Sequence, residues 1–127
     1  MKTMVNYLAI GGAGSLGAMF RYFVATMCAR LFGTAFPIGT FVINISGSFF
    51  LGWFFTITRG RVPVSDTTYL ALAVGFTGAY TTFSTFMLES SSLLGDGSGI
   101  KAMFNLLGSL LVGLLAVRFG VAVAQRY

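Results

Sequence analysis

Five hydroxyl side chains and two glycines crowd into residues 75–86, GFTGAYTTFSTF. The hydroxyl residues are Thr77, Thr81, Thr82, Ser84 and Thr85. Glycine and adjacent β-branched residues both disfavour a regular α-helix, so this composition predicts an interruption. An interrupted helix frees backbone carbonyls, which can bind cations, and backbone amides, which can bind anions. The alternative is that each hydroxyl bonds back to its own helix, but the combination of five hydroxyls with two glycines favours a functional break.

Two aromatic rings lie among these hydroxyls. Phe83 and Phe86 are three residues apart and share one face if a helix resumes there. Such a pair usually belongs to a core or faces lipid. The positive edge of an aromatic ring can also face an anion, which is the alternative function for this pair.

Polar side chains also occur in two other apolar stretches. Asn44 lies in GTFVINISG, and Asn105 and Ser109, four residues apart, form a stripe on one helical face. An amide supplies two donors and an acceptor oxygen. Two functions account equally well for these residues: interhelical hydrogen bonding, worth about 0.6 kcal/mol on average, and lining of a pore.

Two charged residues lie within apolar stretches. Arg21 has a fixed charge near one end of its stretch, so it either extends to the membrane surface or draws anions into a vestibule. Glu89 is the acidic residue that follows the hydroxyl segment. Its ordinary interpretation is extension to the interface or pairing with an arginine, and the alternative is a proton- or cation-coupled role.

The elements that must position these residues are membrane helices. The 127 residues are 56% hydrophobic and 9% charged, whereas soluble domains average about 25% charged residues. A span needs about 20 apolar residues, and four stretches satisfy this requirement. They are residues 4–31, 39–58, 67–94 and 100–124, so we expect residues 1–127 to form a single transmembrane domain of an all-α membrane protein, its third helix broken.

The charged residues exclude several function classes. Eight basic residues give a net charge of +5, but they are spread between apolar stretches and predict no nucleic-acid binding. There is no histidine and one cysteine, Cys28, which removes the commonest general base and any intramolecular disulfide. Four spans place both termini on one side, with four basic residues there against two on the other. This shallow bias predicts insertion in both orientations.

Pairs of small residues four apart recur in three of the stretches. Such pairs allow close helix packing in lipid, either within one bundle or between protomers. They are Ala13–Gly17, Gly14–Ala18, Ser48–Gly52 and Ser109–Gly113.

Together these segments resemble the Fluc/CrcB family of fluoride channels. The resemblance rests on GFTGAYTTFSTF followed by Glu89, GTFVIN with Asn44, GAGSLGAMFRY with Arg21, and NLLGS in the last stretch. These segments have the order and spacing of the family, and the four-helix layout covers nearly the whole chain. The chain departs from the family pattern at Ala79, where the family usually has glycine, and at Met87, where it often has serine. Alanine would add strain if position 79 required a positive φ.

The resemblance implies a passive channel that exports fluoride across the bacterial inner membrane. It further implies an antiparallel, dual-topology homodimer in lipid, with two pores that each use both subunits. A structural Na⁺ at the dimer centre would be held by the backbone carbonyls of Gly78 and Thr81. Arg21 matches the family's first-helix arginine. The pore positions implied by the resemblance, with Asn105 on a track where the family varies, are Asn44, Phe83, Ser84, Thr85, Phe86, Asn105 and Ser109.

Three other functions fit the sequence less well. A small proton-coupled exporter of cationic compounds needs a carboxylate deep in its first helix, and residues 4–31 contain none. An intramembrane enzyme would lack histidine and paired carboxylates within a span. A purely structural membrane subunit conflicts with the sequence only through the energetic cost of so many buried hydroxyls.

Overall fold

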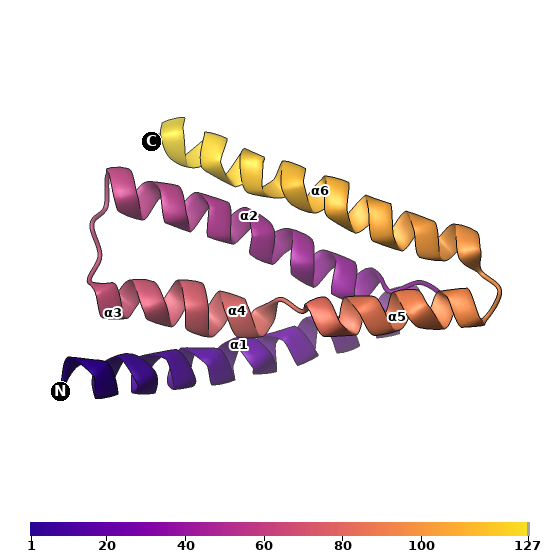
Figure 1. Cartoon of the computed structure of the whole chain (residues 1–127), viewed down its shortest axis with the longest axis horizontal. Coiled ribbons are helices and arrows are strands. Elements are labelled where there is room, and N and C mark those ends of the chain that lie inside the picture. Colours follow the sequence, from indigo (N-terminus) through magenta and orange to yellow (C-terminus); the bar gives the residue numbers. More distant parts are fainter. Residues whose placement is uncertain (127) are drawn as a thin grey trace.

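The computed structural model describes residues 1–126, and Tyr127, the last residue of the predicted domain, lies outside the described residues. The described chain is all helical (Figure 1). Its elements are α1 (Lys2–Phe32), α2 (Ile38–Gly60), α3 (Asp66–Tyr69), the π-helix η1 (Leu70–Thr77), α4 (Gly78–Tyr80), α5 (Phe83–Gly95) and α6 (Gly99–Arg126). Four helical runs are long and apolar enough to cross a membrane, as predicted. They are Lys2–Phe32, Ile38–Gly60, Asp66–Gly95 and Gly99–Arg126.

The spans alternate in direction, so the two termini lie at the same end of the bundle (Figure 1). At this end the Arg61 side chain donates a hydrogen bond to the Gln125 carbonyl at 3.0 Å, which joins the α2–α3 connection to the end of α6. At the opposite end the α5–α6 turn places Gly97 at φ 72°. Glycine adopts this left-handed conformation without steric cost.

Helix α1 lies along η1, and glycines set their separation. A Cβ at Gly17 would overlap the Phe76 carbonyl oxygen, and one at Gly75 would lie 2.7 Å from the Ile10 carbonyl oxygen. Gly75 therefore allows two backbones to meet and does not mark the interruption that the sequence suggested. In the same way, Gly52 on α2 faces the backbone of Val117 on α6. At Gly17 and Gly52, the small-residue pairs pack helices against one another within this chain.

The third span changes its helical geometry along its length. Residues 70–77 form the π-helix, and α4 adds three residues of α-helix. Thr81 (φ −78°, ψ 158°) and Thr82 (φ −150°, ψ 121°) are extended, and α5 begins at Phe83. Figure 1 shows this extended connection between α4 and α5. Ala79 lies in α4, and no residue other than glycine has a positive φ within residues 1–126, so alanine adds no strain of the kind considered above.

Candidate functional site

The Asn44 side chain holds the extended backbone of the third span. Its Oδ1 accepts a hydrogen bond from the Thr82 N–H at 2.8 Å, and its Nδ2 donates to the Thr82 carbonyl at 3.0 Å. One amide thus satisfies both backbone polar groups of a residue that has left the helix. Such pairing is needed because an unpaired backbone group in the membrane interior costs several kcal/mol. Asn44 is therefore a structural partner of the interruption, whatever else it contacts.

Thr82 also begins the next helix. Its Oγ1 accepts a hydrogen bond from the Thr85 N–H at 3.3 Å and donates to the Thr85 hydroxyl at 3.1 Å. This is the geometry of an N-terminal helix cap, in which a threonine oxygen satisfies an amide of the first turn. Thr82 is not among the site residues that the sequence predicts. Its position three residues before Thr85, at the start of a helical run, was the available sequence signal.

Two carbonyl groups are released by these bonds. In a continuous α-helix the Thr82 N–H would donate to the Gly78 carbonyl, and the Thr85 N–H would donate to the Thr81 carbonyl. Here both donors have other acceptors, the side chains of Asn44 and Thr82. Carbonyls of an unwound membrane helix are ligands that Na⁺ accepts. The backbone of Gly78 and Thr81 therefore fits the cation that the resemblance implied.

An open cavity of about 490 Å³ lies beside the extended residues, and we call it the break cavity. It gathers predicted site residues from α2, from the third span and from α6. These are Asn44, Gly78, Thr81, Phe83, Phe86 and Ser109. Residues more than 60 positions apart in the sequence therefore share one surface, and hydroxyl, amide and aromatic groups line it together.

The two phenylalanines differ in their surroundings. Their rings are tilted by 60° with centroids 6.2 Å apart. Phe86 is 5% exposed, whereas Phe83 is 72% exposed. The folded chain therefore encloses one ring and leaves the other on its surface. Ser84 and Thr85, which follow Phe83, are also exposed and do not line the break cavity.

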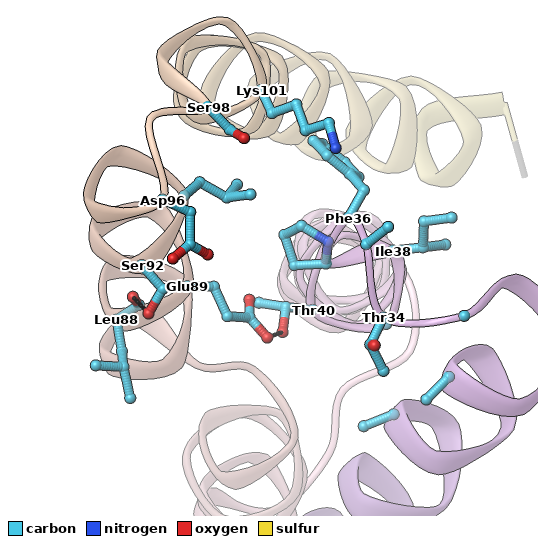
Figure 2. A pocket seen from close by; sticks show the side chains of 17 residues that line it. Thr34, Phe36, Ile38, Thr40, Leu88, Glu89, Ser92, Asp96, Ser98 and Lys101 are labelled. Atoms are coloured by element: carbon cyan, nitrogen blue, oxygen red, sulfur yellow. Dashed lines mark hydrogen bonds between the residues drawn. The ribbon is translucent and has the colours of Figure 1, made fainter.

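A second cavity, of about 560 Å³, lies between the start of α2 and the α5–α6 turn, and we call it the end cavity. Figure 2 shows the side chains of Thr40 and Glu89 pointing toward one another, and Asp96 and Lys101 also line this cavity. The Thr40 hydroxyl donates to Glu89 Oε1 at 2.8 Å. Among residues 1–126, Glu89 Oε2 is buried without a partner. Thr40, and not the arginine considered above, therefore holds the carboxylate.

The polar stripe predicted on α6 is divided between two environments. Asn105 is 1% exposed, and its Nδ2 donates to Ser90 Oγ at 2.9 Å, while Ser90 donates to the Phe86 carbonyl at 2.8 Å. Ser109 lines the break cavity. In the described part of the chain, Asn105 Oδ1 and Ser109 Oγ are buried and have no hydrogen-bond partner. Ser90 was missed by the sequence reasoning, because nothing local connects it to Asn105.

Comparison with known proteins decides the family. The model of the family described as "CrcB-like protein, Camphor Resistance (CrcB)" matches residues 8–121. The chain belongs to the CrcB-like family.

Three relatives of this CrcB-like chain carry the name "Fluoride-specific ion channel FluC". The protein of Chloroflexus aurantiacus is 41% identical over 122 residues, which are 96% of this chain and 97% of that one. The protein of Trichormus variabilis is 37% identical over 124 residues, covering 97% and 90% of the two chains. The protein of Legionella pneumophila is 41% identical over 119 residues, covering 94% and 89%. These matches confirm the family predicted from the sequence.

Arg21 lies outside both cavities of the CrcB-like chain. It is half-buried on α1 and is not part of the lining of the break cavity or the end cavity. The vestibule role expected for Arg21 therefore stays a prediction. The structure brings six predicted residues to the break cavity, places Glu89 in the end cavity, and leaves Arg21 apart from both.

Proposed function

We propose that this CrcB-like chain is a passive, fluoride-selective channel that exports fluoride from the cytoplasm and relieves its toxicity. The observation that carries the proposal is the break cavity, which brings Asn44, Ser109 and the two phenylalanines to one surface beside an unwound segment of helix. The names of the relatives supply the ion. The same names favour a channel over an enzyme.

The lining suits a small, strongly hydrated anion. Hydroxyl and amide donors can replace water around fluoride, and the positive edges of Phe83 and Phe86 add weak attraction. Several weak positions in series let an ion enter and also leave, which conduction requires. In this proposal Ser84, Thr85, Asn105 and Ser109 provide the polar positions, and Arg21 and Glu89 act in the vestibules.

Export needs no coupled energy source. Hydrogen fluoride crosses the membrane, dissociates in the cytoplasm and leaves fluoride trapped there. An inside-negative potential across the bacterial inner membrane then drives each fluoride ion outward with about 2.3 kcal/mol per 100 mV. A channel that merely lowers the barrier for the anion is therefore sufficient.

The working unit in this proposal is an antiparallel, dual-topology homodimer with two pores, each built from both protomers. The exposure of Phe83, 72%, supports this assembly, because a predicted pore residue on the protomer surface needs a second copy to enclose it. The shallow bias of the basic residues, four at one end of the spans against two at the other, supports insertion in both orientations.

A structural Na⁺ belongs to the same proposal. The carbonyls of Gly78 and Thr81 would hold it at the dimer centre, and their release from helical bonding supports this assignment. When bound, sodium supplies a positive charge that stabilises carbonyl oxygens inside the membrane. The chain's own contribution is a pair of bonds that occupy the donors of these two oxygens, from the Thr82 N–H to Asn44 and from the Thr85 N–H to the Thr82 hydroxyl.

The test is fluoride efflux from liposomes that contain the purified protein, with chloride as the comparison ion. We expect rapid fluoride efflux and much slower chloride efflux. Phe83→Leu should greatly slow fluoride efflux while the dimer stays intact. The matched control is Phe104→Leu on α6, because Phe104 is 71% exposed and lies outside the break cavity. Normal efflux through Phe83→Leu, or equal slowing by both variants, would overturn the pore assignment.

A further inference from the structure

Thr77 lies at the joint between the π-helix and the residues that carry the released carbonyls. It is the last residue of η1 and is 3% exposed. Its hydroxyl donates to the Leu72 carbonyl, five residues earlier, at 2.8 Å. Backbone donors of a π-helix reach back the same five residues. The Thr77 side chain therefore adds a bond of π-helical span to the last wide turn.

The backbone carbonyl of Thr77 is bonded to Thr81. The Thr77 carbonyl accepts from the Thr81 N–H at 3.0 Å and from the Thr81 hydroxyl at 3.0 Å. The second bond directs the Thr81 hydroxyl back along the helix, so that this hydroxyl is satisfied locally. One residue thus connects the wide turn at Leu72 to a residue whose carbonyl has left the helix.

The orientation of the backbone at Thr77, between η1 and α4, determines where the carbonyls of Gly78 and Thr81 point. Gly75 and Gly17 hold η1 against the backbone of α1, so η1 cannot rotate freely. Helix α4 has three residues and provides little stiffness of its own. A change of one residue in helical register turns everything downstream by about 100° about the helix axis. Loss of the π-helical turn would therefore aim Gly78 and Thr81 in another direction.

We propose that Thr77 is a positioning residue for the cation held by the carbonyls of Gly78 and Thr81, and that its hydroxyl acts by stabilising the π-helical turn before them. This inference rests on the proposed function, which assigns sodium to those carbonyls. Thr77 itself does not bind the ion in this proposal.

Helix α2 offers a matched control for the hydroxyl. Thr56 Oγ1 donates to the Gly52 carbonyl at 2.8 Å, four residues earlier, within a regular α-helix. Thr56 lines neither the break cavity nor the end cavity. Thr77→Val and Thr56→Val each remove one back-bonded hydroxyl and keep the β-branched shape. Only the first removes it from the π-helical turn.

The experiment compares wild type, Thr77→Val, Thr77→Ser and Thr56→Val as purified full-length proteins. The first readout is the sodium concentration that gives half-maximal fluoride efflux from liposomes. The second is the rise in thermal unfolding temperature in detergent when sodium replaces N-methylglucamine. We expect Thr77→Val to raise the half-maximal sodium concentration about tenfold, as for the loss of one well-placed hydrogen bond, and to reduce the thermal shift. Thr77→Ser keeps this hydrogen bond and Thr56→Val removes one elsewhere, so both variants should have a half-maximal sodium concentration within about twofold of the wild-type value.

Each outcome decides the proposal. An unchanged sodium dependence in Thr77→Val overturns it. A Thr77→Ser variant as impaired as Thr77→Val also overturns it, because serine keeps the hydroxyl and the hydroxyl would then not be what positions the carbonyls. A wild type indifferent to sodium also overturns it. If Thr77→Val does not fold, Thr77→Cys replaces it, since a thiol is a weak donor. A wild type that shows the sodium-dependent thermal shift but conducts no fluoride refutes the proposed function, and the thermal shift still tests Thr77.

Discussion

Helix α2 contacts its neighbours in two different ways along its length. Toward α6 its contact is one of backbones. A Cβ at Gly52 would overlap the Val117 carbonyl oxygen, and a Cβ at Gly120 would overlap the Phe49 carbonyl oxygen and lie 2.8 Å from the Trp53 nitrogen. In lipid, close packing of this kind replaces the missing hydrophobic drive for helix association. This contact therefore serves folding.

Toward the third span the contact of α2 is polar. Asn44 bonds both backbone groups of Thr82, and Gly47 makes room for the Thr81 side chain. In this contact the regular helix α2 packs against the extended backbone of Thr81 and Thr82. One helix therefore fixes the fold through its contact with α6 and holds an irregular segment through its contact with the third span. Substitutions in the contact with α6 should therefore mainly lower stability, and substitutions in the contact with the third span should mainly lower fluoride transport.

The largest expected loss of stability comes from Gly120→Ala. The new methyl group would meet backbone atoms of Phe49 and Trp53, which cannot rotate away, so α2 and α6 must separate. Overpacking of this kind costs about 1–3 kcal/mol, and occasionally more. Thermal unfolding in detergent measures the effect.

The control for this substitution lies on the same helix. A Cβ at Gly108 would meet nothing within 4 Å. Gly108→Ala should therefore keep or raise the stability, since alanine is better than glycine within a helix by about 0.5–1 kcal/mol. Equal destabilisation by both variants would contradict the backbone contact.

Asn44→Ala should act mainly on transport. It leaves the N–H and carbonyl of Thr82 without their partner, and each unpaired buried group costs about 1–3 kcal/mol. The extended segment can reduce this cost by rearranging, which would displace the carbonyls of Gly78 and Thr81. We expect folded protein, strongly reduced fluoride efflux and at least tenfold faster hydrogen exchange at Thr82, a ratio that corresponds to about 1.4 kcal/mol.

An amide at the end of the bundle provides the comparison. Asn6 accepts a hydrogen bond from the Thr67 hydroxyl at 2.6 Å, and water can replace it near the membrane surface. Asn6→Ala should therefore leave efflux and exchange at Thr82 close to wild type. If Asn44→Ala behaved in the same way, the structural role of Asn44 would be wrong.

The spans could be predicted from the sequence because hydropathy and length are local properties. All four observed helical runs begin and end within two residues of the predicted bounds. The segment 75–86 was also selected by composition alone, and the extended residues Thr81 and Thr82 lie within it. Here the adjacent β-branched residues were the informative signal. Gly75 was not, because its role is a tertiary contact with α1.

The partners of the site residues could not be predicted, since they depend on which helices meet. Nothing in the sequence pairs Asn44 with Thr82 or Asn105 with Ser90. The π-helix has no composition signature of its own. The different exposure of Phe83 and Phe86 likewise depends on the neighbours of each ring, and not on their spacing of three residues.

The smallest expected effect, and the sharpest test of the polar contact, belongs to Gly47→Ala. The new methyl group would overlap Thr81 Cγ2 and lie 3.3 Å from Tyr80 Cδ1. These are side-chain atoms and can move, so we expect a cost of about 1 kcal/mol, below that of Gly120→Ala. Thr81 would have to turn and lose the bond from its hydroxyl to the Thr77 carbonyl. Fluoride efflux should fall several-fold with the fold retained.

A second substitution distinguishes this mechanism from general damage to α2. Thr81→Ser removes the methyl group that Gly47→Ala would strike, and it keeps the hydroxyl and the carbonyl. The two changes should therefore be non-additive, because residues in contact couple by about 0.5–3 kcal/mol. The double variant should recover most of the efflux that Gly47→Ala loses. Additive losses would mean that Gly47 acts without Thr81, and the polar contact of α2 would then no longer position the extended segment.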